Sequence, residues 1–329
     1  NYYFMKCFKS NIKFKESNMS LTVKRGFITI ATGKEKYYLL ARNLLFSYRQ
    51  FSKDPLPFGI ITDKENEYTK EFDDVVIMSD SSFSYMDKLK LYRYSPYEET
   101  IFIDADSLAY KDLNTYWDYF HDASDFSCFG SIHDINSKSG WFYNEGLGKY
   151  KDKVSFIPNF NGGIYYLRKT PLCASVFEKA INIANNYSDY SFKMFDKPAD
   201  EPVLALSMAL HNCKPVERFP QSKVFYPIIK KISANIFKQK VSYTTKSKPE
   251  EKTAILIHWQ NSYTTKALYK FEVEKLMLLR RGGNLSLVEK ILYISKLKFY
   301  YFKIYDFIDF IIRKSRKVLG KIKRKLIKY

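Results

Sequence analysis

Cysteine is scarce in this chain, and the few that occur are spread widely along it. The four cysteines are Cys7, Cys128, Cys173 and Cys213, and no two of them form a Cys-x-x-Cys pair. This spacing argues against a disulfide-built scaffold and against a cysteine-ligated zinc site. It is compatible with a protein of a reducing compartment.

The sequence also lacks a hydrophobic run of the roughly 20 residues that a membrane-spanning helix needs. Residues 1–25 are polar and basic and contain no signal-peptide core. Hydrophobic residues nevertheless make up 46% of the chain, so a sizeable core is possible. A length of 329 residues suits one large α/β domain with appendages, or two small domains.

Acidic residues are few at the two ends of the chain. Residues 286–329 hold thirteen Lys and Arg against three acids, a balance of +10, and residues 1–25 hold six against one, a balance of +5. Because the whole chain carries +19, the middle carries only +4. This distribution favours an anionic surface as the partner of the C-terminal tail, and it does not favour a nucleic-acid groove through the domain.

Short apolar segments alternate with amphipathic ones through the first third of the chain. The pattern predicts strands at residues 26–32, 57–62, 75–78 and 101–103 and helices at residues 36–51 and 85–94. Such alternation predicts a mostly parallel sheet with crossover helices. Ligands of such sheets bind beyond the carboxyl ends of the strands, which is where Thr32, Asp63 and Asp104 fall.

The second half of the chain is less regular. We expect a loop leading into a strand at residues 154–167, helices at 171–187, 200–210 and 268–281, and a strand at 253–257. Gly282 and Gly283 are expected to end the last of these helices. The polar and charged residues 238–252 predict an exposed, mobile loop.

Two carboxylates stand where an apolar strand would leave the core. Asp104 and Asp106 directly follow the predicted strand at residues 101–103. An unpaired buried carboxylate is costly, and two carboxylates spaced i, i+2 repel each other. A divalent cation between them and a phosphate would resolve both problems, because Mg²⁺ and Mn²⁺ are usually held by one or two carboxylates and phosphate oxygens. From these residues alone, a solvated Asp-x-Asp-Ser turn is the alternative.

Five segments in order resemble the GT-A glycosyltransferases, and most closely glycosyltransferase family 8, the family of glycogenin and bacterial lipopolysaccharide galactosyltransferases. The segments are Ala31-Thr32 with Tyr37, Lys88-Leu89, Asp104-Ala105-Asp106, Phe160-Asn161-Gly162-Gly163-Ile164, and His258. The resemblance implies an α/β fold of GT-A type, with a Rossmann-like, mostly parallel sheet flanked by helices. We accordingly expect a basic N-terminal extension at residues 1–25, a glycosyltransferase domain at 26–266 and a basic, amphipathic helical tail at 267–329.

The resemblance also assigns roles to individual residues. Asp104, Asp106 and His258 would hold the metal, and an imidazole ligand suits Mn²⁺ better than Mg²⁺. The alternative for His258 is a strand-end histidine packed on Trp259. Residues that would meet the nucleotide-sugar donor are Ala31, Thr32, Tyr37, Asp63, Lys88, Asp104, Ala105, Asp106, Asn161, Gly162 and Gly163. Of these, Tyr37 could instead belong to a helix core, and the glycines could instead form a tight turn or bulge.

Asp200 and Glu201 are the candidates for touching the reacting sugar. Since Pro202 suits the first turn of a helix, Asp200 could instead be its N-cap. A retaining enzyme, which family 8 implies, needs no strong base, because the departing phosphate can take the acceptor proton. An inverting enzyme would need one of these two carboxylates for that step. This chain departs from the family's Asp-Gln-Asp here, and residues 259–266 lack the family's Gly-x-x-Lys-Pro-Trp.

Two aromatic segments remain. Trp141, Phe142 and Tyr143 form a loop that could stack on an acceptor sugar or plug the core. The tail from residue 285 combines aromatics and aliphatics with nine Lys and Arg in its last seventeen residues, which is typical of an amphipathic helix at a membrane interface. Each basic group near an anionic leaflet contributes about 1 kcal/mol. The alternatives are a core-docking helix with a solvated charge run, and a nucleic-acid arm, for which no motif is present.

These observations predict a metal-dependent glycosyltransferase, retaining by resemblance, that moves a hexose from a UDP-linked donor to a glycan or glycolipid. The expected setting is surface polysaccharide or lipopolysaccharide assembly, peripherally on the cytoplasmic face of the membrane. A nucleotidyltransferase is an alternative, although Thr32-Gly33-Lys34 is too short for its Gly-rich phosphate loop. A non-enzymatic membrane- or nucleic-acid-binding protein is another alternative, and it predicts that Asp104→Ala leaves function intact.

Overall fold

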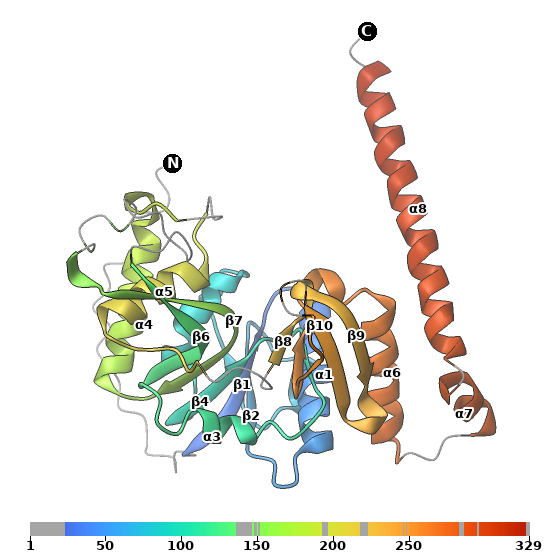
Figure 1. The fold of residues 1–329 in the computed structure, drawn as a ribbon, viewed down its shortest axis with the longest axis horizontal. Helices are drawn as coiled ribbons and strands as arrows, with labels where there is room; N and C mark the ends of the chain where they lie inside the picture. The colour runs from blue at the N-terminus through green and yellow to red at the C-terminus, as the bar shows by residue number, and fades with distance from the viewer. Residues whose placement is uncertain are drawn as a thin grey trace.

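The computed structural model describes residues 24–135, 152–192, 197–217, 223–245, 249–282, 286–294 and 296–326, together with residues 147, 150 and 247. The expectations for residues 1–23 and for the aromatic loop at residues 141–143 lie outside the described residues. Figure 1 shows an α/β body from which one long C-terminal helix extends.

A six-stranded sheet forms the centre of the body, in the order β3-β2-β1-β4-β7-β6. Its strands are β1 (Arg25–Ala31), β2 (Phe58–Thr62), β3 (Val75–Ile77), β4 (Glu99–Ile103), β6 (Phe126–Asp134) and β7 (Phe156–Arg168). Strands β3, β2, β1 and β4 pair in parallel, whereas β7 runs antiparallel to both of its neighbours. The predicted mostly parallel sheet is therefore confirmed, with one reversed strand.

The helices cover both faces of this sheet and continue beyond it. The α-helices are α1 (Glu35–Phe51), α2 (Leu91–Tyr94), α3 (Thr115–Tyr119), α4 (Pro171–Asn185), α5 (Asp200–Leu210), α6 (Ala267–Arg280), α7 (Leu287–Ile294) and α8 (Leu297–Leu326). The helix predicted at residues 85–94 begins as a 3₁₀ turn, η2 (Tyr85–Lys90), before α2. Helix α6 ends as predicted, with Gly282 at a positive φ of 87° that favours glycine.

The prediction of a loop before β7 was wrong, because β7 is one long strand, which pairs with β6 over residues 156–160 and 165–167 and gains β4 as a second neighbour in its last part. Its first part, residues 156–160, pairs with β6, and its last part pairs with β4 over residues 164–168. Asn161, Gly162 and Gly163 lie between these two paired stretches. The bend places these three residues beside the end of β4, where the Gly163 carbonyl accepts the Asp104 amide at 3.0 Å.

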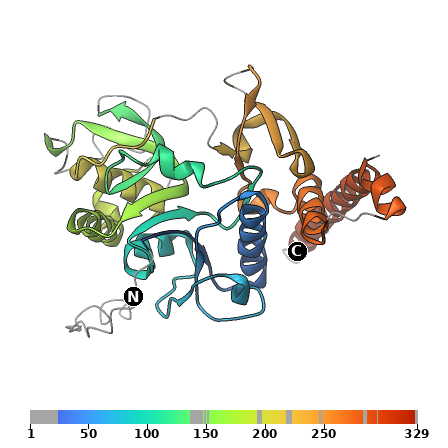
Figure 2. The ribbon, with the colours of Figure 1, turned by 90° about the horizontal axis from the view of Figure 1, so that it is seen from below.

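Two small sheets stand beside the central one. The first has the order β5-β12-β8 and contains β5 (Ser107–Ala109), β12 (Leu256–His258) and β8 (Lys223–Phe225). The second has the order β11-β10-β9 and contains β11 (Lys252–Thr253), β10 (Lys240–Thr245) and β9 (Ile229–Asn235). Figure 2 shows these strands as a separate layer next to the main sheet.

Two expectations for this region were wrong. The single strand expected at residues 253–257 is divided between β11 and β12, which belong to different sheets. The exposed loop expected at residues 238–252 contains β10, because Val241 and Tyr243 alternate inward and are buried in the core. Gln239 turns the chain into this strand with a φ of 50°.

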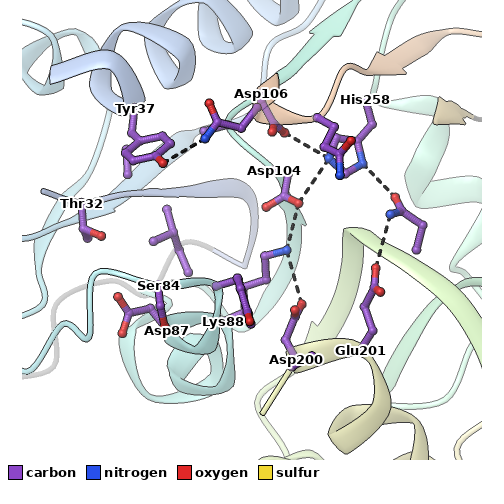
Figure 3. Close-up of a pocket in the computed structure, with 18 of the residues that line it drawn as sticks. Thr32, Tyr37, Ser84, Asp87, Lys88, Asp104, Asp106, Asp200, Glu201 and His258 are labelled. Atoms are coloured by element: carbon purple, nitrogen blue, oxygen red, sulfur yellow. Dashed lines mark hydrogen bonds and ion pairs between the residues drawn. The ribbon is translucent and has the colours of Figure 1, made fainter. Parts of the chain in front are cut away.

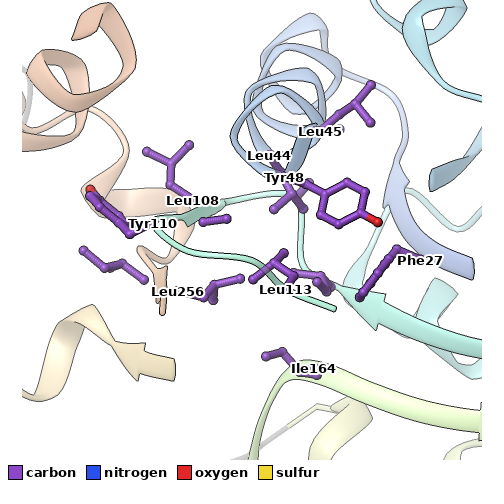
Figure 4. Packing of buried hydrophobic residues seen from close by; sticks show 14 of the residues in the cluster. Phe27, Leu44, Leu45, Tyr48, Leu108, Tyr110, Leu113, Ile164 and Leu256 are labelled. Atoms are coloured by element: carbon purple, nitrogen blue, oxygen red, sulfur yellow. The ribbon is translucent and has the colours of Figure 1, made fainter. Parts of the chain in front are cut away.

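The core has two parts, one on each face of the central sheet. Alternation along β1 sends Phe27 to one face and Ile28 to the other, and β4 does the same with Ile101 and Phe102. One face packs against α1, β5 and β12 through Leu44, Leu108 and other residues shown in Figure 4. The other face packs against α4 and α5.

The C-terminal helices begin on this body. Leu276 of α6 is part of the core on the α1 side of the sheet. Asp306 of α8 accepts the backbone amide of Ala267 at 2.6 Å and the Lys270 ammonium at 3.2 Å, and so attaches α8 to the start of α6. Among the described residues, every helix is either too short or too polar to cross a bilayer.

Candidate active site

A pocket of about 840 Å³ opens beyond the carboxyl ends of β1 and β4. This is the edge at which sheets of this kind bind ligands. Figure 3 shows the polar side chains that line it. The lining residues are Ile30, Ala31, Thr32, Tyr37, Phe83, Ser84, Tyr85, Asp87, Lys88, Asp104, Ala105, Asp106, Phe160, Asn161, Ala199, Asp200, Glu201, Phe225, His258, Gln260 and Asn261.

Asp104, Asp106 and His258 come together in this pocket, as the family resemblance implied. The two acids lie in the turn between β4 and β5, and His258 ends β12, whose pairing with β5 places it opposite Ser107. His258 Nε2 lies 3.1 Å from Asp106 Oδ1 and 3.5 Å from Asp104 Oδ2. One possible ligand atom from each residue falls within 4.8 Å of the other two.

The other ring nitrogen of His258, Nδ1, contacts Asn161 in the bend of β7. His258 Nδ1 lies 2.8 Å from Asn161 Oδ1. Because an amide oxygen can only accept, Nδ1 carries a hydrogen, and Nε2 is the ring nitrogen that faces the two carboxylates. Metal-ligating histidines are oriented in this way by a hydrogen bond to the other ring nitrogen.

The donor set fits a divalent cation. Asp106 Oδ1 is buried and has no hydrogen bond of normal geometry, so it is an orphaned anionic atom facing the imidazole. Burial acts to raise the pKa of Asp106, but His258 outweighs it and holds that pKa low. When no metal is bound, a proton on Nε2 of His258 attracts the Asp106 carboxylate, and a bound cation would take the place of that proton. Two carboxylate oxygens and one imidazole nitrogen form an arrangement that suits Mn²⁺.

Lys88 stands on the opposite side of Asp104 and bridges the two acidic groups of the pocket. Its ammonium lies 2.9 Å from Asp104 Oδ2 and 3.3 Å from Asp200 Oδ2, and it donates to the Gly162 carbonyl at 3.0 Å. Burial acts to lower the pKa of Lys88, but these two carboxylates outweigh it and raise the pKa. Lys88 is therefore a permanent cation at the wall of the pocket.

Asp200 and Glu201 open α5 and face the same pocket. Asp200 is not the N-cap, because the helix begins at this residue and Ala199 precedes it as the cap. Asp200 Oδ2 accepts the Tyr165 hydroxyl at 2.9 Å, and Glu201 Oε1 accepts the Gly162 amide at 2.7 Å. Burial, followed by the charge of Asp200, raises the pKa of Glu201.

The two glycines of the bend leave room for these side chains. A Cβ at Gly163 would lie 2.4 Å from His258 Nδ1, and one at Gly162 would lie 2.5 Å from the Tyr165 hydroxyl and 2.8 Å from Asp200 Oδ2. Real Cβ atoms essentially never approach so closely. Gly162 and Gly163 thus act through the packing of the site and do not line the pocket themselves.

Of the residues expected to contact the donor near the end of β1, some line the pocket and one lies behind its wall. Ala31, Thr32 and Tyr37 line the pocket, and the Tyr37 hydroxyl accepts the amide of Asn261 at 3.0 Å. Asp63 lies behind this wall and holds the turn after β1, since it accepts the Gly33 amide at 3.0 Å and the Tyr38 hydroxyl at 2.6 Å.

Several pocket residues were not predicted from the sequence. Phe83 and Ser84 come from the loop before η2, Tyr85 is the first residue of η2, and Gln260 and Asn261 follow β12. Phe83 and Gln260 both have positive φ, at 54° and 62°. Their segments have no periodic pattern, so only the neighbourhood of His258 in the sequence could have pointed to the last two.

Two solved structures of a galactosyltransferase, LgtC, share this architecture. The complex of LgtC with donor and acceptor sugar analogues aligns with a TM-score of 0.50 and 12% identity, over 80% of this chain and 98% of that chain. An active-site mutant of LgtC aligns with a TM-score of 0.50 and 13% identity, over 82% of this chain and 99% of that one. Mouse xyloside xylosyltransferase 1 in its apo form aligns with a TM-score of 0.44 and 12% identity, over 73% and 99%.

At this level of identity the likeness shows the fold, and the expectation of a GT-A fold is confirmed. No protein-family model matches the chain, and no curated protein matches it in sequence.

Proposed function

We propose that this protein is a metal-dependent glycosyltransferase that moves a hexose from a nucleotide sugar, UDP-linked in our proposal, to a glycan or glycolipid. The observation that carries the proposal is the cluster of Asp104, Asp106 and His258 at the ligand-binding edge of a GT-A fold. The proposed setting is surface polysaccharide or lipopolysaccharide assembly. The solved neighbour LgtC, bound to donor and acceptor sugar analogues, supports the same class of substrates.

In this proposal each wall of the pocket has a separate task. Asp104, Asp106 and His258 would hold Mn²⁺ or Mg²⁺, which when bound stabilises the negative charge that develops on the leaving diphosphate. Lys88 places a second positive charge on the same side of the pocket. Thr32 and Tyr37 stand at the far wall, where they would seat the nucleotide base.

We propose a retaining reaction, in which neither acid on α5 has to act as a base. Asp200 is 6% exposed and is held by Lys88 and the Tyr165 hydroxyl. Glu201 is held by the amide of Gly162. Each carboxylate is thus held in place through one of its oxygens, Oδ2 of Asp200 and Oε1 of Glu201. We propose that they position the donor sugar and that the departing phosphate accepts the proton.

A panel of sugar nucleotides tests the proposal. We expect slow hydrolysis of at least one UDP-hexose, dependent on Mn²⁺ or Mg²⁺ and lost in Asp104→Asn and Asp106→Asn variants that keep the wild-type melting temperature. Release of UDP indicates glycosyl transfer, whereas consumption of a sugar phosphate together with a nucleoside triphosphate, with release of pyrophosphate, would indicate a nucleotidyltransferase. If the wild type turned over and bound no donor, the enzyme proposal would be wrong.

We also propose that the protein works peripherally at an anionic membrane surface on the cytoplasmic side. The side of α8 that faces away from α6 exposes an apolar stripe at helical spacing, consisting of Tyr300, Ile304, Phe307, Ile308 and Ile311. Such a stripe, followed by a basic run without acids, suits a lipid interface.

Vesicle flotation of the full chain tests this location. We expect binding to vesicles that contain phosphatidylglycerol, weaker binding to pure phosphatidylcholine, and loss of binding when Ile304 and Phe307 are both replaced by Glu. The double substitution of Lys230 and Lys231 to Glu, in the exposed part of β9, is the control for a general change of charge. Equal binding by all variants, or dimerisation through α8 in light scattering, would contradict the proposal.

A further inference from the structure

Lys223, at the start of β8, is a buried lysine to which the proposed reaction gives no task. Its side chain is 1% exposed, and among the described residues no carboxylate lies within ion-pair distance of its ammonium group. Burying a charged group without a counter-ion is costly, and burial lowers the pKa of Lys223 to about 8. The ammonium donates to two atoms of one residue, the Asn161 carbonyl at 2.9 Å and Asn161 Oδ1 at 3.3 Å.

These contacts determine which way the Asn161 amide faces. An ammonium group can only donate, so the side-chain atom that faces it is the amide oxygen. The amide nitrogen then points the other way, toward Glu201 Oε1 at 3.3 Å. The orientation of an amide is assigned from its hydrogen-bond partners. Here the Lys223 ammonium on one side and the Glu201 carboxylate on the other both require the same orientation of Asn161.

The orientation of Asn161 is passed on to the metal-binding histidine. Asn161 Oδ1 lies 2.8 Å from His258 Nδ1 and can only accept a hydrogen from it. If the amide were reversed, its NH₂ group would face Nδ1, and the hydrogen of the neutral imidazole would move to Nε2. Nε2 would then point a hydrogen at Asp104 and Asp106 instead of the lone pair that a cation needs.

We propose that Lys223 is a positioning residue of the metal centre, which acts through Asn161 to hold His258 in the tautomer that presents Nε2 to the cation. The inference rests on the proposed function, since it takes Asp104, Asp106 and His258 as the ligands. It assigns a task to a residue that lies outside the pocket lining.

A positioning role and simple charge repulsion predict opposite changes in Mn²⁺ affinity when Lys223 is replaced. A positive charge near a cation site repels the cation, so charge removal alone would tighten metal binding. If Lys223 acts through Asn161, its replacement by Met instead weakens binding, because the amide is free to turn. Replacement by Gln removes the charge but keeps an N–H donor, and this variant separates the two effects.

The test titrates Mn²⁺ alone into the full-length wild type and its variants by calorimetry. We expect Lys223→Met to weaken Mn²⁺ binding by about 10- to 100-fold, the usual cost of losing an outer-shell partner. Lys223→Gln should stay nearer to the wild type. The control is Lys169→Met, because Lys169 is a half-buried lysine that likewise donates to a backbone carbonyl, that of Tyr92, but lies outside the pocket lining.

A second readout follows the tautomer without any metal. The chain has four histidines, so a histidine-selective ¹⁵N spectrum at alkaline pH is simple to assign with a His258→Gln variant. We expect His258 of the wild type to carry its hydrogen on Nδ1 and Lys223→Met to show a mixture of both tautomers. If Lys223→Met does not fold, Asn161→Leu removes the same link from the other side and should give the same loss of Mn²⁺ affinity.

The outcomes separate this inference from the proposed function. If the wild type does not bind Mn²⁺, the metal centre and with it the proposed reaction are wrong. If the wild type binds Mn²⁺ but Lys223→Met binds equally or more tightly and keeps the tautomer, only the role of Lys223 is wrong.

Discussion

Replacement of Gly163 by Ala tests the geometry of the proposed metal centre, because it adds a single methyl group beside His258. The added Cβ would lie 2.4 Å from Nδ1 and 2.9 Å from Cε1 of His258. The imidazole is 5% exposed, with the Phe225 ring at 5.2 Å, so it has little space into which it can retreat. The Gly163 carbonyl also accepts the Asp104 amide at 3.0 Å, so a shift of the backbone moves a second proposed ligand.

The size of the effect follows from these distances. Relief of the overlap requires about 1 Å of movement, because ordinary contacts begin near 3.4 Å. Overpacking of this kind costs about 1–3 kcal/mol of folding free energy. For the cation, displacing a ligand should cost at least the ~10–100-fold in affinity that a disturbed outer shell costs.

Calorimetry with Mn²⁺ and urea unfolding measure the two effects separately. The control is Gly26→Ala, whose Cβ would meet the Tyr97 ring at 2.5 Å at the start of β1, the end of the strand remote from the pocket. We expect both variants to lose stability and only Gly163→Ala to lose Mn²⁺ affinity. Equal Mn²⁺ affinity of Gly163→Ala and the wild type would refute the geometry assigned to His258.

Three further predictions concern lysines. Lys88→Met should tighten the binding of Mn²⁺ alone, because it removes the ammonium group that lies 2.9 Å from Asp104. The same substitution should weaken the binding of UDP together with Mn²⁺, and a change of the same sign in both titrations would contradict this. Burial lowers the pKa of Lys223 from 10.5 to about 8, so the unfolded chain binds the proton more tightly than the folded protein. As the pH rises from about 8 to 10.5, the free energy of unfolding of the wild type should therefore increase by up to about 3 kcal/mol relative to that of Lys223→Met, as measured by urea unfolding. A difference that does not change with pH would contradict the burial of Lys223. Lys275→Met should destabilise the protein by about 3–5 kcal/mol in the same assay, because Lys275 forms a buried ion pair with the fully buried Glu272.

The sequence predicted the elements whose side chains repeat with a clear period. The strands at β1, β2 and β4 and helix α1 are apolar on the faces that the structure buries, so their alternation was sufficient. β10 was missed because Val241 and Tyr243 are its only apolar residues and the rest of the strand is polar or charged. The reversal of β7 depends on pairing with β4 and β6, which no local pattern encodes.

The proposed metal ligands were predictable, whereas the residues that orient them were not. Asp104 and Asp106 stand next to an apolar strand, which is a local signal, whereas His258 was predicted from the family resemblance. The link from Asn161 to His258 joins residues 97 positions apart. Lys223 lies in a short strand without periodicity, in a chain with 54 Lys and Arg, and its burial is set by the packing of β8 against β12.

The most direct test of the central claim is anomalous diffraction from crystals soaked with Mn²⁺ and UDP. We expect a manganese peak that is coordinated by a carboxylate oxygen of Asp104, a carboxylate oxygen of Asp106 and Nε2 of His258, with the diphosphate on its open side. A pocket that contains UDP but no such peak, with Lys88 still paired to Asp104, would contradict it.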